Sequence, residues 1–241
     1  MATSPAARQK PDNTLFYISC VVAAALLTVF GIVADQVVDG DTASFDHAVV
    51  MLFRDPATPG IPIGPSWFNE AVRDVTALGS FSVLGILVIG VVLHLFLTGS
   101  RRTGWLVAIS VLGGTIISTV LKMLFDRPRP DFTGAVEVFT SSFPSGHATT
   151  SAVVYLTIGA LLAQRASTWP ARTLYLLGAI ILVGAVGLSR IYLGVHFPTD
   201  VMAGWALGAA WALICLAVAH ALRGRGTLRD EAPPGPPTEA S

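Results

Sequence analysis

Three short segments combine cations, histidines and an aspartate in a pattern that could carry out chemistry. They are KMLFDRPRP (Lys122 to Pro130), FPSGHATTS (Phe143 to Ser151) and SRIYLGVHFPTD (Ser189 to Asp200). Lysine and arginine side chains bind tetrahedral anions through charge-assisted hydrogen bonds, and histidine serves as a nucleophile or a proton carrier. The combination therefore indicates chemistry on a phosphate group.

The cations of these segments suit a phosphate in number and shape. Lys122 supplies a point charge, and Arg129 and Arg190 supply two planar forks. Ser145 and Gly146 stand where a helix is expected to begin, so the serine can cap the helix and the glycine lets backbone N–H groups approach an anion. Each element alone also has an ordinary structural interpretation, such as snorkelling for Lys122. The set together predicts a phosphate-binding site.

Two histidines are placed to supply the reaction. His196 lies four residues before Asp200, so the carboxylate can bind one ring nitrogen and leave the other free to attack. His147, beside the expected helix start, is placed to act as a second proton-transfer group. Because this division needs a neutral His196 and a protonated His147, we expect kcat/KM to be bell-shaped near mildly acidic to neutral pH.

The remaining histidines are interpreted as structural or interfacial. Patterns such as H-E-x-x-H, C-x-x-C or D-x-D-x-D do not occur in the sequence, so neither a metal site nor a cofactor is predicted. The histidines interpreted in this way are His47, His94 and His220.

The composition requires a membrane to position these residues. Only 12% of the 241 residues are charged and 53% are hydrophobic, with a mean hydropathy of +0.67. An average soluble domain carries about 25% charged residues, so this chain cannot cover a water-facing surface. The 15 Lys and Arg against 15 Asp and Glu leave no basic excess for a nucleic-acid partner. The chain is predicted to be a polytopic protein of the lipid bilayer.

Six apolar runs are long enough to cross a bilayer as helices, which need about 20 residues each. We expect a single all-α domain over residues 15–222, a flexible N-terminus over 1–14 and a disordered tail over 223–241. The long loop from Asp39 to Thr76 includes an interfacial amphipathic turn over Phe45 to Arg54. The runs are Leu15–Val38, Ala77–Leu97, Trp105–Phe125, Ser145–Ala163, Leu174–Leu193 and Thr199–Ala221.

Basic residues set the orientation of such a chain, because they concentrate on the cytoplasmic side. Nine of the fifteen fall inside when the N-terminus is cytoplasmic. We therefore expect a plasma-membrane protein with both termini in the cytoplasm and the three segments on the extracytoplasmic face. Small residues spaced as Gly204-x-x-x-Gly208 and Ser110-x-x-x-Gly114-x-x-x-Ser118 further predict close contacts between helices.

The three segments resemble a known family. K-x6-R-P from Lys122, P-S-G-H from Pro144 and S-R-x5-H-x3-D from Ser189 match the three-part signature of the type-2 phosphatidic acid phosphatase superfamily. This superfamily includes the lipid phosphate phosphatases and shares its site with vanadium haloperoxidases. The resemblance covers roughly residues 40 to 221, and it implies a six-helix membrane bundle of the acid phosphatase and vanadium haloperoxidase type.

The resemblance also implies a role for each signature residue. His196 resembles the nucleophile that forms a phosphohistidine, Asp200 its orienting partner, and His147 the general acid that then activates water. The implied substrate is a membrane lipid whose phosphate or diphosphate lies at the extracytoplasmic face, and cations are implied to take the place that magnesium holds in other phosphoryl-transfer enzymes. The residues implied to hold the phosphoryl oxygens are Lys122, Arg129, Ser145, Gly146 and Arg190.

Other activities and several substrates remain open from the sequence. A transporter or channel would spread its charges through the depth of the bilayer, whereas here they gather at the outer ends of the later helices. A haloperoxidase would be soluble, and a catalytically silent lipid-phosphate binder need not retain every signature residue. Undecaprenyl diphosphate is the leading substrate, with phosphatidylglycerol phosphate, phosphatidate and diacylglycerol pyrophosphate as alternatives. The motifs do not separate these lipids, and they do not indicate an oligomeric state.

Overall fold

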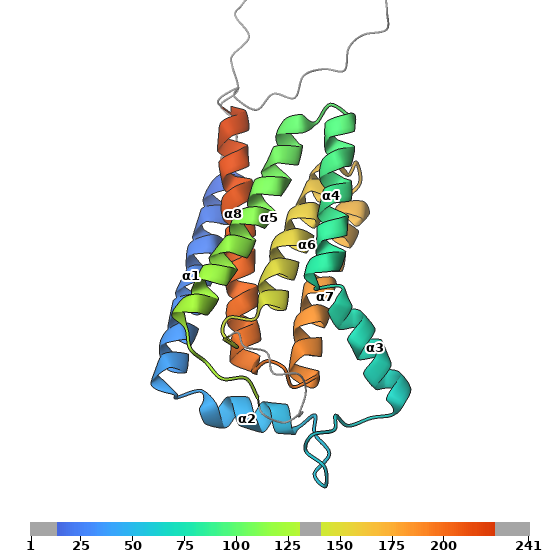
Figure 1. Ribbon diagram of the computed structural model, residues 1–241. Helices are drawn as coiled ribbons and strands as arrows, with labels where there is room; N and C mark the ends of the chain where they lie inside the picture. The colour runs from blue at the N-terminus through green and yellow to red at the C-terminus, as the bar shows by residue number, and fades with distance from the viewer. Residues whose placement is uncertain (1–13, 131–140, 225–241) are drawn as a thin grey trace, which may run out of the picture.

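The computed structural model describes residues 14–130 and 141–224, and this part of the chain is helical (Figure 1). Apart from one isolated bridge between Arg54 and Pro62, the described residues form no β-structure. The helices are α1 (Thr14–Asp39), α2 (Ala43–Met51), α3 (Ser66–Ala77), α4 (Phe81–Leu97), α5 (Arg101–Leu124), α6 (Gly146–Arg165), α7 (Trp169–Tyr192) and α8 (Pro198–Gly224).

Six of these helices correspond in order to the six predicted spans. Five are long and apolar enough to cross a membrane, and α3 with α4 makes a sixth candidate that is bent by 45° at the break between them. α4 has only 17 residues, which is about 26 Å at 1.5 Å per residue. It therefore reaches the length of a bilayer core only with the help of its bent neighbour.

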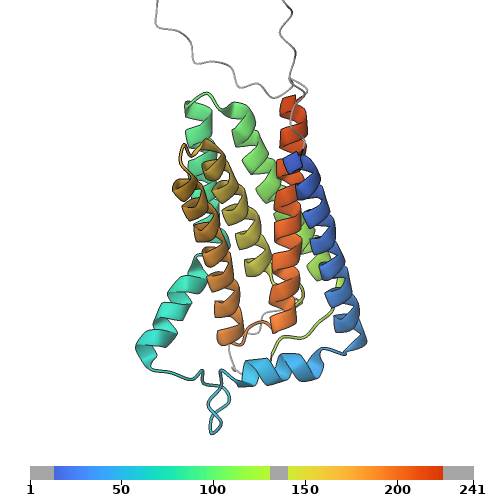
Figure 2. The ribbon, with the colours of Figure 1, turned by 180° about the vertical axis from the view of Figure 1, so that it is seen from behind.

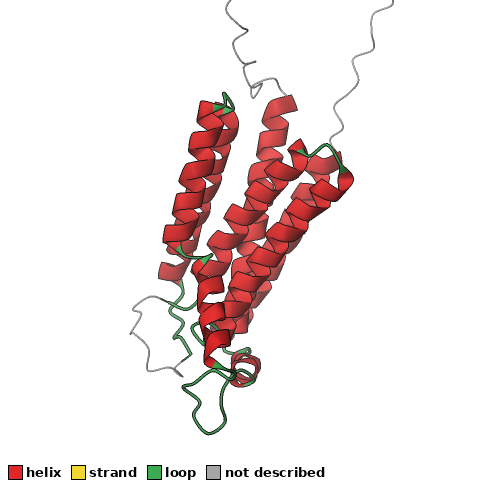
Figure 3. Cartoon of the chain, turned by 90° about the vertical axis from the view of Figure 1, so that its right-hand side faces the viewer, coloured by secondary structure: helices red, strands yellow, loops and turns green. Residues whose placement is uncertain are grey.

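α6 forms the centre of the bundle and α1 its edge. In the most apolar stretch of each helix, 72% of the residues are buried in α6 but only 6% in α1. α6 packs against α5, α7 and α8, whereas α1 packs mainly along α8 (Figure 2). Many large apolar side chains of the outer helices are exposed, as expected where a helix faces lipid instead of water. The side view in Figure 3 shows the long helices running side by side along the bundle.

Close packing of α8 on α6 fixes the two helix starts that carry predicted site residues. A Cβ atom on Gly208 would lie 2.5 Å from the carbonyl oxygen of Thr149, and one on Gly204 would lie 2.8 Å from that of Ser145. Only glycine allows the backbones this close, so the predicted small-residue contact is confirmed here. The Ser145 amide also donates to the carbonyl oxygen of Asp200 at 2.9 Å.

The second predicted contact is likewise present between α5 and α6. Ser110 Oγ lies 3.4 Å from Thr157 Oγ1, and a Cβ on Gly114 would lie 2.8 Å from Val153. Ser118, the third member of the spacing, is also buried. These contacts hold α5, and with it Lys122, at a constant distance from the start of α6.

The long loop before the second span differs from the sequence-based expectation. It contains two helices, because the predicted turn at Phe45 is the nine-residue α2 and because Ser66–Ala77 forms α3. α2 lies across the end of the bundle and α3 slants away from it (Figure 1). α3 is short and mixes charged with apolar residues, so it does not form a long apolar run.

The remaining predicted spans differ from the helices by a few residues at their ends. The second span begins at Phe81 instead of Ala77, after a turn at residues 78–80. α8 continues to Gly224, two residues into the segment predicted as a tail. The expectations of a flexible N-terminus and a disordered tail otherwise fall on residues outside the described part of the chain, as do residues 131–140 of the loop before Ser141.

Candidate active site

Four helix ends bring the predicted site residues to one end of the bundle. Lys122 is in the last turn of α5, His147 in the first turn of α6, Arg190 in the last turn of α7, and Asp200 in the first turn of α8. Because these helices alternate in direction, the ends of α5 and α7 lie beside the starts of α6 and α8 (Figure 1). The loops that follow α5 and α7 add Arg129 and His196.

His196 is almost fully buried and is oriented from one side by Asp200. Its Nδ1 lies 3.5 Å from Asp200 Oδ2, which is long for a hydrogen bond. Ser142 Oγ contacts both groups, since it lies 3.3 Å from that ring nitrogen and donates to Asp200 Oδ2 at 2.5 Å. The backbone amide of Phe197 donates to the same oxygen at 2.8 Å. These contacts place the Nδ1 edge of the ring against Ser142 and the carboxylate.

The other ring nitrogen of His196 faces a cation. Its Nε2 lies 3.3 Å from Arg129 Nη1, and the same guanidinium nitrogen donates to the carbonyl oxygen of Val195 at 3.0 Å. With the proton of the ring on the side of Asp200, the lone pair of Nε2 points toward the cation-lined space. That is the orientation a nucleophile needs when the electrophile is a bound phosphate.

Burial keeps this imidazole neutral. It lowers the pKa of His196 to about 4, with Asp200 acting in the opposite direction and Arg129 adding to the decrease. Burial also lowers the pKa of the Arg129 guanidinium. At neutral pH the Nε2 nitrogen is therefore unprotonated even though a carboxylate lies beside the ring.

Lys122 and Arg190 flank the start of α6 from two sides. Lys122 Nζ donates to the carbonyl oxygen of Ser141 at 2.9 Å, and its Cε would lie 3.3 Å from a Cβ on Gly146. Arg190 Nη1 donates to Thr76 Oγ1 at 3.0 Å. His147 lies within electrostatic range of both cations, of Arg129 and of His196. The predicted residues thus lie around one point, next to the N-terminus of α6.

Two buried donors at this point have no protein partner. Ser145 Oγ and Arg190 Nε are buried and make no hydrogen bond in the described structure. Ser145 also does not cap α6 with its side chain, although it stands at the N-cap position. Buried polar groups are normally satisfied, and leaving one unpaired costs about 1–3 kcal/mol. An oxyanion bound at the helix start would accept from both groups.

A buried ion-pair network behind Asp200 was missed by the sequence analysis. Arg127 lies between two carboxylates, with Nη1 2.6 Å from Asp200 Oδ1 and Nη2 2.6 Å from Asp46 Oδ2. Asp46 in turn accepts from the amide of Thr199 at 3.1 Å and from its hydroxyl at 2.6 Å. The network attaches α2 to the start of α8, directly behind the His196–Asp200 pair.

Arg54 holds the loop that carries His196 in a similar way. Its Nη2 donates to the carbonyl oxygen of Tyr192 at 2.8 Å, and it packs against Gly194, which adopts a φ of 67°. A side chain at Gly194 would collide with the guanidinium as well as strain this backbone. Such partners lie far apart in the chain. For the Arg127 network, the only sequence signals were Asp46, an aspartate in an otherwise apolar helix, and Arg127, an arginine additional to Arg129 in the first segment.

Comparisons with known proteins agree with this architecture. The family model described as PAP2 superfamily matches residues 103–223. Phosphatidylglycerophosphatase B of Bacillus subtilis is 33% identical over 197 residues, which cover 81% of this chain and 88% of that protein. Decaprenylphosphoryl-5-phosphoribose phosphatase of Mycobacterium tuberculosis is 43% identical over 114 residues, 45% of this chain and 58% of that protein.

A solved structure has the same fold. The crystal structure of the transmembrane PAP2 type phosphatidylglycerolphosphate phosphatase from Bacillus subtilis superposes with a TM-score of 0.70 and 30% identity, and the match covers 81% of this chain and 94% of that one. The chain belongs to the PAP2 superfamily. It is an all-α, multi-pass membrane phosphatase of lipid phosphates, which confirms the fold and enzyme class expected from its three segments.

Proposed function

We propose that this protein hydrolyses a lipid phosphate through a phosphohistidine at His196. The Nε2 lone pair attacks phosphorus, and the bond between phosphorus and the lipid oxygen breaks while His147 donates a proton to that oxygen. In the second step His147 takes a proton from water, and the water oxygen attacks phosphorus. The bond from phosphorus to Nε2 then breaks, which releases inorganic phosphate and restores both histidines.

The observation that carries the proposal is that the two ring nitrogens of His196 have different partners. Asp200 and Ser142 hold the Nδ1 edge, while Nε2 faces Arg129. Asp200 is the orienting partner in this proposal, and it stabilises the positive charge that develops on the ring as Nε2 bonds to phosphorus. A pKa of about 4 supplies the neutral nucleophile.

Positive charge in the site takes the role of a metal in this proposal. Lys122, Arg129 and Arg190 neutralise the phosphoryl oxygens, and the unpartnered Ser145 hydroxyl and the amide of Gly146 donate to them. The charge that builds up on these oxygens in the transition state is then stabilised by fixed donors in a partly buried site. The reaction should therefore proceed in the presence of a chelator.

The proposal includes the side of the membrane and the lipid class. We place the site at the extracytoplasmic face and both termini in the cytoplasm, since arginines occupy the helix ends remote from the site. Residues 15–222 act as the one catalytic domain. Similarity over most of its length to a phosphatidylglycerophosphatase favours a phosphatidate-type monoester over undecaprenyl diphosphate as the substrate.

Phosphate release by purified protein in detergent with EDTA tests the mechanism. His196→Ala should abolish release at an unchanged melting temperature, and His94→Ala, which changes an exposed histidine near the other end of the bundle, should leave it unchanged. Protein quenched in alkaline denaturant, in which a phosphorus–nitrogen bond survives, should carry labelled phosphate in the parent and none in the His196 variant. Full turnover by the His196 variant would refute the assigned nucleophile.

A second assay separates the lipids and the membrane sides. Phosphatidylglycerol phosphate, phosphatidate, diacylglycerol pyrophosphate and undecaprenyl diphosphate are compared at equal surface concentration in proteoliposomes of known orientation. We expect the fastest release from the glycerolipid monoesters, in vesicles whose external surface is the extracytoplasmic face of the protein. Release only from vesicles of the opposite orientation would overturn the assigned side.

A further inference from the structure

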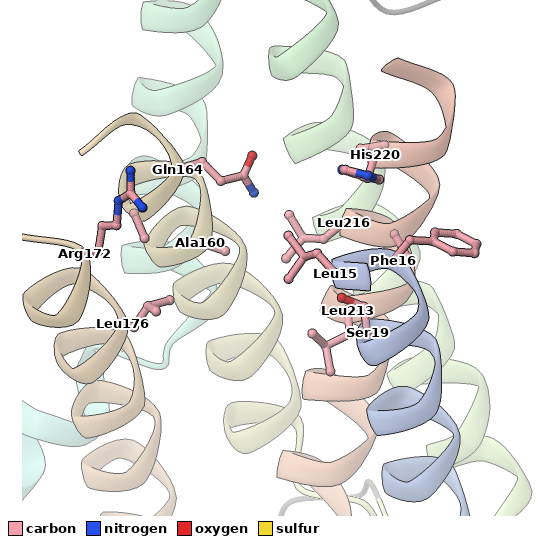
Figure 4. A pocket seen from close by; sticks show the side chains of 13 residues that line it. Leu15, Phe16, Ser19, Ala160, Gln164, Arg172, Leu176, Leu213, Leu216 and His220 are labelled. Atoms are coloured by element: carbon pink, nitrogen blue, oxygen red, sulfur yellow. The ribbon is translucent and has the colours of Figure 1, made fainter. Parts of the chain in front are cut away.

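A cavity of about 680 Å³ lies at the end of the bundle remote from the active site (Figure 4). The starts of α1 and α7 and the ends of α6 and α8 form it. Arg172 on its rim is 18 residues before Arg190 on the same helix, which corresponds to about 27 Å at 1.5 Å per residue. The cavity and the phosphate site are therefore separated by nearly the thickness of a bilayer core.

The cavity has the two-part lining of a lipid site. Leucines from three helices form its apolar wall, while Gln164, Arg172 and His220 lie toward the outer end (Figure 4). Leu15 and Leu176, on opposite sides of it, are both exposed on the bundle surface. An apolar hollow at this depth contains hydrocarbon in a membrane, and its volume is within the range of ordinary ligand pockets.

The charges at this end of the described bundle all have one sign. The acidic residues that the structure describes are all on the other half of the molecule. The first of them in the sequence is Asp35, near the far end of α1, and the last is Asp200, at the start of α8. Basic pockets between membrane helices attract anionic lipid headgroups, and here no described carboxylate opposes that attraction. The charged side chains at this end are Arg101, Arg102, Arg165 and Arg172.

Arg172 is held in place to receive such a headgroup. Its Nε donates to the carbonyl oxygen of Ala166 at 3.1 Å, which attaches the guanidinium to the C-terminal end of α6. This contact uses only the Nε–H of the planar group, which has further donors on its terminal nitrogens. His220 on α8 lies across the cavity from it (Figure 4). Arg172 therefore supplies the charge for a headgroup at one side of the cavity, and His220 adds a polar group at the other side.

We infer that this cavity binds one phospholipid with an anionic headgroup from the leaflet opposite the active site. Its phosphate is held by Arg172, Gln164 and His220 line the rest of the polar end, and an acyl chain lies along the leucines between α1 and α7. The lipid fills a gap beside α1, which is otherwise held mainly by α8. Because α7 and α8 also carry Arg190 and Asp200, the bound lipid stabilises the helices that form the site at the other end.

Thermal unfolding of the full chain in neutral detergent tests this inference. Phosphatidylglycerol should raise the melting temperature more than phosphatidylcholine does, because a ligand of the folded state stabilises it by mass action. Arg172→Gln should weaken phosphatidylglycerol binding about tenfold, as expected for a lost charge-assisted contact. Arg101→Gln, which removes a charge from the same end but not from the cavity, should leave the difference intact.

Two further measurements distinguish lipid binding in the cavity from binding at the active site and from a folding defect of the Arg172 variant. Saturating inorganic phosphate should not remove the phosphatidylglycerol effect, whereas it would if the lipid bound at the active site. Leu216→Phe, which fills the cavity without changing charge, should weaken both lipids even if the Arg172 variant fails to fold. Equal shifts with the two lipids, or an unchanged preference in both variants, would overturn the inference, and so would loss of the effect in phosphate.

Discussion

The ion-pair network around Arg127 predicts that a residue outside the phosphate-binding set affects both stability and catalysis. Arg127→Gln removes the cation that lies 2.6 Å from each of Asp46 and Asp200. Both carboxylates have a relative exposure of 0%, so neither can regain its solvation in water. Breaking a buried ion pair by removing one partner costs about 3–5 kcal/mol of stability. The variant should therefore unfold at a clearly lower temperature than the parent.

The effect on catalysis follows from the position of Arg127 behind Asp200. In the described part of the chain, the side-chain contacts of Arg127 do not include Lys122, Arg129 or Arg190, so its loss should lower kcat and leave KM nearly unchanged. One charge-assisted hydrogen bond contributes about 1.5–3 kcal/mol, which corresponds to a decrease in kcat of about 10- to 100-fold. Phosphate-release kinetics at a temperature below the transition of the variant measure both constants.

Asp46 provides the matched control for this experiment. Asp46→Asn removes the negative charge of α2 that pairs with Arg127 but leaves Arg127 on Asp200, so kcat should fall less than in Arg127→Gln. The double variant should show a coupling energy of about 0.5–3 kcal/mol in thermal stability. A folded Arg127→Gln variant with kcat within twofold of the parent would refute the positioning role. An increase in KM alone would instead indicate direct contact with the phosphate.

Three further predictions follow from individual contacts. Burial lowers the pKa of His196 to about 4, so its protonation should reduce kcat/KM only as pH falls toward 4, well below the limb near 6.5 expected of an ordinary histidine. Gly208→Ala places a Cβ 2.5 Å from the Thr149 oxygen and should destabilise the protein by about 1–3 kcal/mol, whereas Gly178→Ala, which meets no atom within 4 Å, should not. Ser142→Ala removes the hydroxyl that donates to Asp200 and should lower kcat about tenfold at constant KM.

Each of these predictions has a clear contrary outcome. An acid limb of kcat/KM near pH 6.5, in protein that remains folded, would mean that the imidazole is more solvated than its burial indicates. Equal melting temperatures for the two glycine variants would contradict the close contact of α6 with α8. A fully active Ser142→Ala variant would leave Asp200 as the sole orienting group for the Nδ1 edge.

The long apolar helices could be read directly from the sequence. A bilayer offers no partner for backbone amides, so any run of about 20 apolar residues must satisfy its own hydrogen bonds as a helix. The predicted run Leu15–Val38 differs from α1 by one residue at each end for this reason. α3 was not predicted because its 12 residues are too few for such a run and include charged side chains.

For the candidate site, too, local sequence patterns determine one part and contacts between distant residues determine the other. The residue types and spacings of the three segments determined which side chains could bind a phosphate and attack it, because helix periodicity and alternating direction bring those segments to one face. Only the tertiary structure decided how they are supported. Arg127 reaches Asp46 across 81 residues of chain, and Arg54 reaches Tyr192 across 138. Spacing along a chain cannot specify such pairs, because they depend on how α2 and the loops pack against the helix ends.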